Sequence, residues 1–137
     1  MYVDTNVFVY WLYENSDFHN EGVECVRKIE EDKDNEYFTS TFTVFQVYLV
    51  ISHYVRDLSK EEIAKKVNEA ISSISNLRIV DLKFEDLLRV PEYLRLGLDF
   101  DDSLHASIMD RYNSNTIISN DKDFDKIFNR RFPCNRT

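Results

Sequence analysis

Short apolar runs recur along the chain and predict buried strands separated by helices. Residues 1–3 are apolar and end abruptly at Asp4, residues 36–41 are rich in β-forming side chains, and residues 77–80 and 116–118 are two further short runs. Strands that alternate with helical segments favour a mainly parallel sheet covered by helices on both faces. The pattern therefore predicts a three-layer α/β/α fold with about four to five short strands.

Helical periodicity and capping residues account for the segments between these strands. Asn6 is expected to cap the first helix, and Ser59 with Glu62 has the spacing of a capping box at the start of an amphipathic helix that contains Ile63 and Ile74. Residues 43–54 are rich in β-branched and aromatic side chains but exceed the usual strand length, so a buried helix is expected there. The other helices are expected over residues 7–13, 20–31, 85–96 (with Pro91 as a start, kink or break), 99–112 and 124–128, and residues 130–136 as an edge strand or a partly loose tail.

Length and composition fit a single globular domain over residues 1–137. Hydrophobic residues make up 43% of the chain, and the 10 Phe and 8 Tyr supply ample bulk for a core, while only 2 Gly and 2 Pro argue against a loop-rich chain. Asp4 interrupts the apolar start, so no secretory leader is expected. The longest apolar stretch, residues 42–55, contains several polar residues and is too short to span a bilayer, so no membrane segment is expected.

The net charge of −8 changes the expected mode of any nucleic-acid contact. A module that holds nucleic acid on a broad basic face is usually basic, so this charge counts against a simple binding module. It is compatible with a metal-dependent nuclease, because such a site gathers carboxylates whose charge bound cations partly offset. Most of the excess is expected on solvated helix faces, for example at Glu30, Glu31, Asp32 and Asp34.

The two cysteines, Cys25 and Cys134, are far apart and have no CxxC spacing. A structural zinc site is therefore not expected. Both are interpreted as reduced thiols, the usual state in the cytoplasm, which is the predicted location.

Four aspartates have positions that predict a shared site. Asp4 and Asp121 follow two of the strands, Asp102 lies in the first turn of the helix before the second of these strands, and Asp123 follows Asp121 by two residues. Each alone could be a turn, cap or solvated residue. In a parallel sheet, however, the carboxyl ends of the strands meet at one edge, where ligands bind. Hard cations such as Mg²⁺ prefer oxygen ligands, so the joint pattern predicts a Mg²⁺ or Mn²⁺ site.

The chain resembles the PIN-domain family along nearly its whole length. The resemblance rests on residues 3–8 (an apolar residue, then Asp-Thr-Asn-Val-Phe), residues 100–106 (Phe-Asp-Asp-Ser-Leu-His-Ala) and residues 118–124 (Ile-Ser-Asn-Asp-Lys-Asp-Phe). It implies a PIN-like fold, Mg²⁺- or Mn²⁺-dependent endoribonuclease activity on an RNA substrate, frequent homodimers and, for VapC-like toxins, an antitoxin partner. By motif match it assigns catalytic metal-ligand roles to Asp4, Asp102 and Asp121, an accessory metal-binding role to Asp123, and supporting roles to Asn6 and Ser119.

One residue departs from the family pattern. The family usually has a Glu on the helix after the second strand, and Gln46 stands at that position. Gln keeps a carbonyl oxygen that can ligate a metal or bind water, but it lacks the negative charge. The alternative hypothesis is therefore a degenerate PIN-like domain that has weak or no nuclease activity and binds RNA or a protein partner.

Other candidate chemistries are weaker. Asp4 and Asn6 are similar in spacing to the first motif of haloacid-dehalogenase-like phosphatases, but Asn6 lacks the general acid. Residues 121–132 resemble a Ca²⁺ loop but have Lys126 and Phe132 at the required Gly and Glu positions. His53 and His105 are lone histidines on expected helices and are not chosen as a general base. Basic residues that could contact phosphate or simply form a solvated face are Arg111, Lys122, Lys126, Arg130, Arg131 and Arg136.

Overall fold

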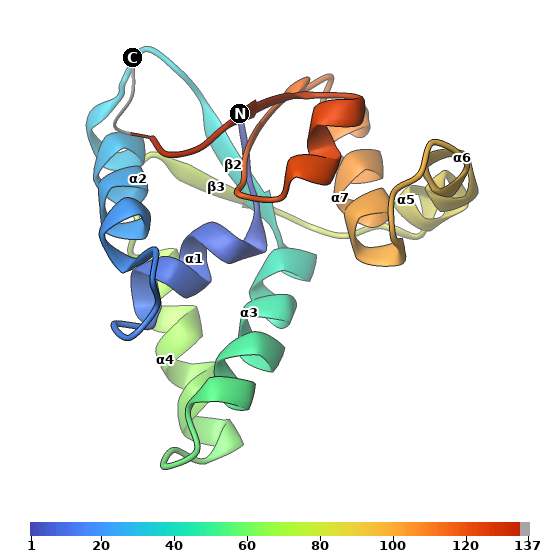
Figure 1. The fold of residues 1–137 in the computed structure, drawn as a ribbon. Helices are drawn as coiled ribbons and strands as arrows, with labels where there is room; N and C mark the ends of the chain where they lie inside the picture. Colours follow the sequence, from blue (N-terminus) through green and yellow to red (C-terminus); the bar gives the residue numbers. More distant parts are fainter. Residues whose placement is uncertain (135–137) are drawn as a thin grey trace.

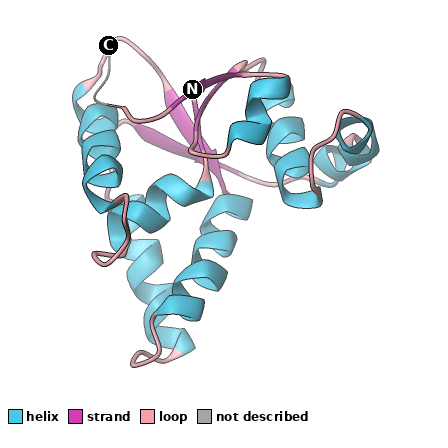
Figure 2. Cartoon of the chain, in the orientation of Figure 1, coloured by secondary structure: helices cyan, strands magenta, loops and turns pink. Residues whose placement is uncertain are grey.

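The computed structural model describes residues 1–134 and has a parallel sheet between two layers of helices (Figures 1 and 2). Its strands are β1 (Tyr2–Val3), β2 (Tyr37–Ser40), β3 (Leu77–Val80), β4 (Thr116–Ile118) and β5 (Asn129–Arg131). The order across the sheet is β3-β2-β1-β4-β5, and every neighbouring pair is parallel. The predicted three-layer fold is confirmed, and β5 shows that the C-terminal tail adds an edge strand.

Strand β1 lies at the centre of the sheet and fixes the place of the site. Tyr2 is opposite Phe38 of β2 on one side and Ile117 of β4 on the other. The chain continues outward from β1 to β2 and β3 in one direction and later to β4 and β5 in the other. The strand order therefore reverses beside β1, and the crevice at the carboxyl ends of β1 and β4 is the place where ligands bind in such sheets.

One face of the sheet is covered by four helices, which lie together in Figure 1. These are α1 (Thr5–Leu12), α2 (His19–Glu31), α3 (Thr41–Tyr54) and α4 (Lys60–Ser72). Val3 and Ile118 of the sheet pack against their buried side chains, which include Phe8, Ile29 and Val47. Gly22 lets α2 approach α1 closely, because a Cβ at this position would lie 2.6 Å from the backbone nitrogen of the facing helix.

The other face carries the remaining helical segments. These are α5 (Phe84–Leu88), α6 (Val90–Arg95), α7 (Phe100–Arg111) and the short 3₁₀ helix η1 (Lys122–Lys126). Tyr2 and Ile117 point to this face and pack with Leu104, Ile108 and Phe124. Successive residues of a strand point to opposite faces, so Tyr2 and Val3 divide the core into these two parts.

Helix ends show where the sequence interpretation was right and where it was wrong. Residues 41–54 do form helix α3, and Ser59 with Glu62 forms the expected capping box of α4. The cap of α1 is Asp4, which accepts the Thr5 backbone N–H at 2.7 Å, and not Asn6. The expected helix over residues 85–96 is divided into α5 and α6, with Pro91 in the first turn of α6. The expected last helix is the 3₁₀ helix η1, which begins two residues earlier than predicted.

A disulfide joins Cys25 of α2 to Cys134, with a Cα–Cα distance of 4.9 Å. The prediction of two reduced thiols is therefore wrong for this structure. The two residues are separated by 109 positions in the sequence, but the segment after β5 runs back to α2 and brings them together (Figure 1). The predicted loose tail at residues 135 and 136 lies outside the described residues.

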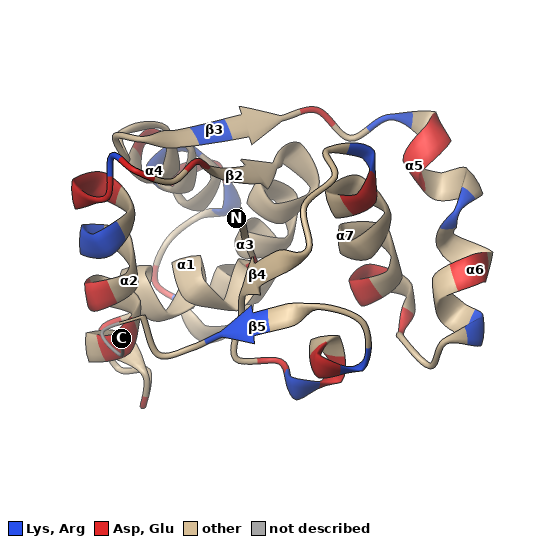
Figure 3. Ribbon diagram, turned by 90° about the horizontal axis from the view of Figure 1, so that it is seen from above, with Lys and Arg blue, Asp and Glu red and all other residues tan. Residues whose placement is uncertain are grey.

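Charged residues of both signs are interspersed along the helices and the η1–β5 segment, as the colours of the ribbon show (Figure 3). One ion pair is buried: the Arg111 guanidinium binds Asp86 through Nε–Oδ1 at 2.7 Å and Nη2–Oδ2 at 3.0 Å. Asp86 is 1% exposed, and this contact raises the pKa of Arg111 above its usual range. Arg111 is thus engaged within the fold rather than at a phosphate site. Within the described part of the chain, no helix has the length and apolarity needed to cross a membrane.

Candidate metal centre

A cavity of about 610 Å³ opens at the carboxyl ends of β1 and β4. Polar side chains from α1, α3, α7 and the segment after β4 meet on its wall. They include Asp4, Gln46, Asp101, Asp102, His105 and Asp121. The three acids that the sequence placed at the centre of the site therefore do converge on one cavity.

Asp4 is buried and firmly oriented. Its Oδ1 accepts the Thr5 backbone N–H at 2.7 Å, and its Oδ2 accepts the Ser119 hydroxyl at 2.6 Å and the Asn6 side-chain N–H at 3.3 Å. Asn6 also donates to Ser119 Oγ at 3.2 Å. Because Asp4 caps α1 and follows β1 directly, the carboxylate is fixed by both elements. Asn6 and Ser119, the residues predicted as supporting, both contact the Asp4 carboxylate.

Asp102, Asp121 and Asp123 form a compact carboxylate group. One oxygen from each lies within 4.8 Å of the others. Burial of Asp102, hydrogen bonding to Asp121 and the negative charges of Asp121, Asp101 and Asp4 raise the pKa of the Asp102 carboxyl to about 9. Asp123 is exposed, and its backbone N–H donates to Asp121 Oδ1 at 3.0 Å. The protein thus concentrates negative charge that a bound cation could neutralise.

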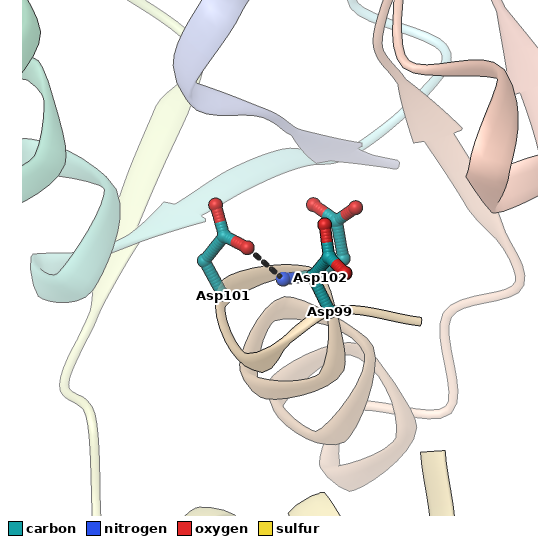
Figure 4. A group of neighbouring side chains, drawn as sticks. All are labelled: Asp99, Asp101 and Asp102. Carbon is teal, nitrogen blue, oxygen red and sulfur yellow. Dashed lines mark hydrogen bonds between the residues drawn. The ribbon is translucent and has the colours of Figure 1, made fainter. Parts of the chain in front are cut away.

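A second group comprises Asp99, Asp101 and Asp102 in and before the first turn of α7, and it also has one oxygen from each side chain within 4.8 Å. Figure 4 shows all three projecting from this turn, with Asp101 separate from the other two in that view. The Asp102 backbone N–H donates to Asp101 Oδ1 at 3.0 Å. Asp101 Oδ2 receives an N–H from Gln46 at 3.5 Å. Asp102 therefore belongs to both carboxylate groups.

Gln46 and His105 form the boundary between the cavity and the core. Gln46 Oε1 accepts the Thr5 hydroxyl at 2.6 Å and lies 2.6 Å from His105 Nε2, which is also 3.4 Å from Asp4 Oδ1. The other ring nitrogen, His105 Nδ1, lies 2.6 Å from the Tyr2 hydroxyl. Burial lowers the pKa of His105, against the opposing effect of nearby carboxylates such as Asp4. A buried neutral imidazole has one N–H donor and one acceptor, so one ring nitrogen of His105 donates and the other accepts.

The far wall of the cavity is aromatic. Tyr13 and Tyr54 stack with ring centroids 5.3 Å apart, and Tyr10 packs against Phe18 at 5.1 Å. Five aspartates and neither Lys nor Arg occur among the described residues that line this cavity. Two basic residues predicted near the site have partners within the fold. Lys126 donates to the Gly97 carbonyl oxygen, and its Nζ also lies 3.7 Å from Asp123 Oδ1. Arg130 pairs with Asp125.

Sequence reasoning missed His105, Thr5 and Asp101 as parts of the site. His105 was set aside as a lone histidine, yet it is 1% exposed and follows Asp102 by three residues on α7. Residues three apart lie on the same helix face, and this spacing was an available signal. Thr5 and Asp101 each lie next to a predicted acid in the sequence. Whether their side chains face the cavity depends on how α1 and α7 are oriented about their axes, which the sequence does not show.

The donor set fits a hard divalent cation. Mg²⁺ and similar ions bind oxygen at about 2.0–2.6 Å, so two oxygens on one ion lie at most about 4–5 Å apart. The oxygens of Asp102, Asp121 and Asp123 satisfy this limit, and the negative charge of Asp121 contributes, after burial, to the raised pKa of Asp102.

Solved structures share the fold. VapC20 of Mycobacterium tuberculosis, described as a sarcin-ricin loop cleaving toxin, has a TM-score of 0.71 at 14% identity over 90% of this chain and 92% of that chain. VapBC2 of Rickettsia felis, bound to a promoter DNA fragment, has a TM-score of 0.64 at 20% identity over 95% of this chain and 96% of that chain. FitAcB of Neisseria gonorrhoeae has a TM-score of 0.67 at 14% identity over 98% of this chain and 99% of that chain.

No curated protein matches the sequence. The family described as PIN domain matches residues 1–128, which is most of the chain and includes every acid of the carboxylate site. The strand order and the carboxylate cavity at the ends of β1 and β4 agree with this match. The chain therefore belongs to the PIN-domain family.

Proposed function

We propose that this chain is a Mg²⁺- or Mn²⁺-dependent endoribonuclease that hydrolyses phosphodiester bonds in RNA. The observation that carries the proposal is the convergence of Asp4, Asp102 and Asp121 on one cavity at the strand ends. Structurally similar proteins include one described as an RNA-cleaving toxin. The fold supports nuclease activity in general, and the carboxylate chemistry supports dependence on a divalent metal.

Asp102, Asp121 and Asp123 would hold the ion, and Asp4 would complete the site. A bound ion would supply Lewis-acid catalysis of phosphodiester hydrolysis. Ser119 and Asn6 hold Asp4 in one orientation, which reduces the reorganisation needed when the substrate arrives.

The charge of the cavity explains why a metal is needed. RNA phosphates are repelled by the ionised aspartates of the lining, and the described lining residues provide no Lys or Arg to offset this repulsion. A divalent ion reverses the local charge. The exposed rings of Tyr54 and Phe18 offer surfaces on which unpaired bases can stack.

The test is cleavage of mixed single-stranded and structured RNA with Mg²⁺, Mn²⁺ or EDTA, with Asp4→Asn beside the wild type. Cleavage that requires metal and is lost in Asp4→Asn supports the proposal. A folded wild type that binds Mn²⁺ but cuts no RNA would instead favour the degenerate PIN-like domain suggested by Gln46.

We also propose that the chain is the toxin of a toxin–antitoxin pair, acts in the cytoplasm and forms a homodimer. The structural neighbours include toxin–antitoxin complexes, and large apolar side chains are exposed on α3 (Phe45 and Leu49) and α7 (Phe100). The Cys25–Cys134 disulfide is unusual for a reducing compartment, so cysteine oxidation in cells is a direct test of the location. Growth arrest on induced expression, relieved by Asp102→Asn, tests the toxin role, and the mass in solution tests the dimer.

A further inference from the structure

The amide of Gln46 can be oriented from its partners. An amide oxygen only accepts hydrogen bonds and an amide nitrogen only donates. Oε1 lies near two groups that can donate, Thr5 Oγ1 and His105 Nε2, while Nε2 lies 3.5 Å from a carboxylate oxygen of Asp101. The opposite orientation would place the amide oxygen against that carboxylate. The N–H of Gln46 therefore points to Asp101.

A continuous set of hydrogen bonds supports this orientation from the core. His105 Nε2 donates to Gln46, so His105 Nδ1 must accept, and its partner is the Tyr2 hydroxyl. The Tyr2 oxygen is then free to accept from Ser40 Oγ, 2.8 Å away, or Thr43 Oγ1, 3.1 Å away. Tyr2 and His105 are buried, and every donor in the series is directed toward Gln46 Oε1.

The amide oxygen of Gln46 is thereby occupied. A carbonyl oxygen has two lone pairs, and Thr5 and His105 use both. This oxygen is not available as a metal ligand, although Gln46 stands at the position where the family usually has a Glu.

Asp101 is the nearby carboxylate that can fill this role. It lines the same cavity, and one of its oxygens lies within 4.8 Å of an Asp102 oxygen. Its two oxygens receive the Asp102 backbone N–H and the Gln46 N–H, so the group is held at the cavity wall although it is exposed. Its distance from Asp102 is compatible with shared coordination after a small rotation.

We propose that Asp101 supplies the fourth core carboxylate of the metal centre, and that Gln46 is a positioning residue that directs Asp101 through its N–H. This inference rests on the proposed metal-dependent function. It assigns the charge that Gln46 lacks on α3 to the neighbouring helix α7. The four core acids are then Asp4, Asp101, Asp102 and Asp121, and Asp123 remains an accessory carboxylate.

Calorimetric titration with Mn²⁺ tests the assignment without measuring cleavage. Asp101→Asn is expected to weaken Mn²⁺ binding about 10-fold or more, within the range for loss of a group that supports a metal site. Glu61→Gln removes one charge from the exposed first turn of α4 and is the matched control, with unchanged affinity. The double variant Gln46→Glu, Asp101→Asn keeps the net charge and moves the carboxylate to α3, so it is expected to recover most of the wild-type affinity.

The outcomes separate this inference from the proposed function. If the wild-type protein shows no saturable Mn²⁺ binding, the proposed metal centre is refuted, and the assignment of Asp101 is refuted with it. Wild-type binding that Asp101→Asn leaves unchanged overturns only the role of Asp101. A double variant that binds as weakly as Asp101→Asn overturns the exchange of roles between positions 46 and 101.

The tautomer of His105 tests the positioning role of Gln46 independently. Long-range ¹H–¹⁵N spectra of the imidazole are expected to show a proton on Nε2 and none on Nδ1. A proton on Nδ1 would reverse the series, turn the Gln46 oxygen toward Asp101 and overturn the positioning role. A merely structural role of Gln46 would not require one particular tautomer of His105, so the position of the imidazole proton reports specifically on the direction of the hydrogen bonds.

Discussion

Replacing Asp102 by Asn is predicted to stabilise the metal-free protein at mildly alkaline pH. Burial and the charges of Asp121, Asp101 and Asp4 raise the pKa of the Asp102 carboxyl to about 9, from 3.8 in the unfolded chain. Between these two values the folded state holds a proton that the unfolded state has released. The free energy of unfolding therefore falls as the pH rises through this window, which is the reverse of the usual behaviour of a carboxylate.

The size of the effect follows from proton linkage. One proton of difference changes the free energy of unfolding by about 1.4 kcal/mol per pH unit. From about pH 7 to about pH 8.5, a difference of one full proton at Asp102 would lower the free energy of unfolding by about 2 kcal/mol. Solvent in the cavity screens the carboxylates, so we expect a loss of about 1 kcal/mol in the wild type that is absent in Asp102→Asn.

The assay is urea unfolding in EDTA at both pH values, with the disulfide kept oxidised. The comparison uses the difference between wild type and Asp102→Asn, because other groups also contribute to the pH dependence, such as the N-terminal amine, whose pKa is lowered by burial. Glu61→Gln controls for the loss of one acidic side chain and should keep the wild-type slope. Equal pH slopes for wild type and Asp102→Asn would refute the reasoning, because they would show that Asp102 is already ionised in the folded protein.

Three further predictions concern stability. Asp86→Ala leaves the partly buried Arg111 guanidinium without its carboxylate and should lower the free energy of unfolding by about 3–5 kcal/mol; a loss below about 1 kcal/mol in urea unfolding would contradict this. Replacing Cys25 and Cys134 by Ser opens a long loop and should cost about 2–5 kcal/mol, while two free thiols in the native wild type by thiol titration would disprove the disulfide. Gly22→Ala places a methyl group 2.6 Å from the α1 backbone and should destabilise by about 1–3 kcal/mol, and an unchanged melting temperature would show that the two helices can separate at little cost.

The fold was largely predictable because β1, β3 and β4 are short and mostly apolar, and because each of β1 to β4 is followed by a helical segment. The same feature located the acids: Asp4 and Asp121 follow β1 and β4, and the carboxyl ends of parallel neighbours meet at one edge. Asp102 was predictable from its place in the first turn of α7. These inferences use only local pattern and the geometry of parallel sheets.

The remaining features depend on how distant elements rotate and pack. The partners of His105 come from β1 and α3, so its role needs the orientation of α7 relative to both elements. The Cys25–Cys134 pairing needs the path of the chain after β5, which sequence spacing does not encode. The sequence pointed to Pro91 as the place where the helix over residues 85–96 starts, bends or breaks, but it did not decide among these outcomes, since proline is compatible with each.

The pairing of β1 with β4 has a consequence for protein synthesis. Asp4 is translated before its partners: its backbone N–H pairs with Ile118, and its carboxylate pairs with Ser119, 115 residues later in the chain. Asp121 follows later still. A nascent chain that has not yet reached Asp121 has neither the paired strands β1 and β4 nor the complete set of acids. If the chain cuts RNA, its competence to do so therefore arises only after this segment has been synthesised.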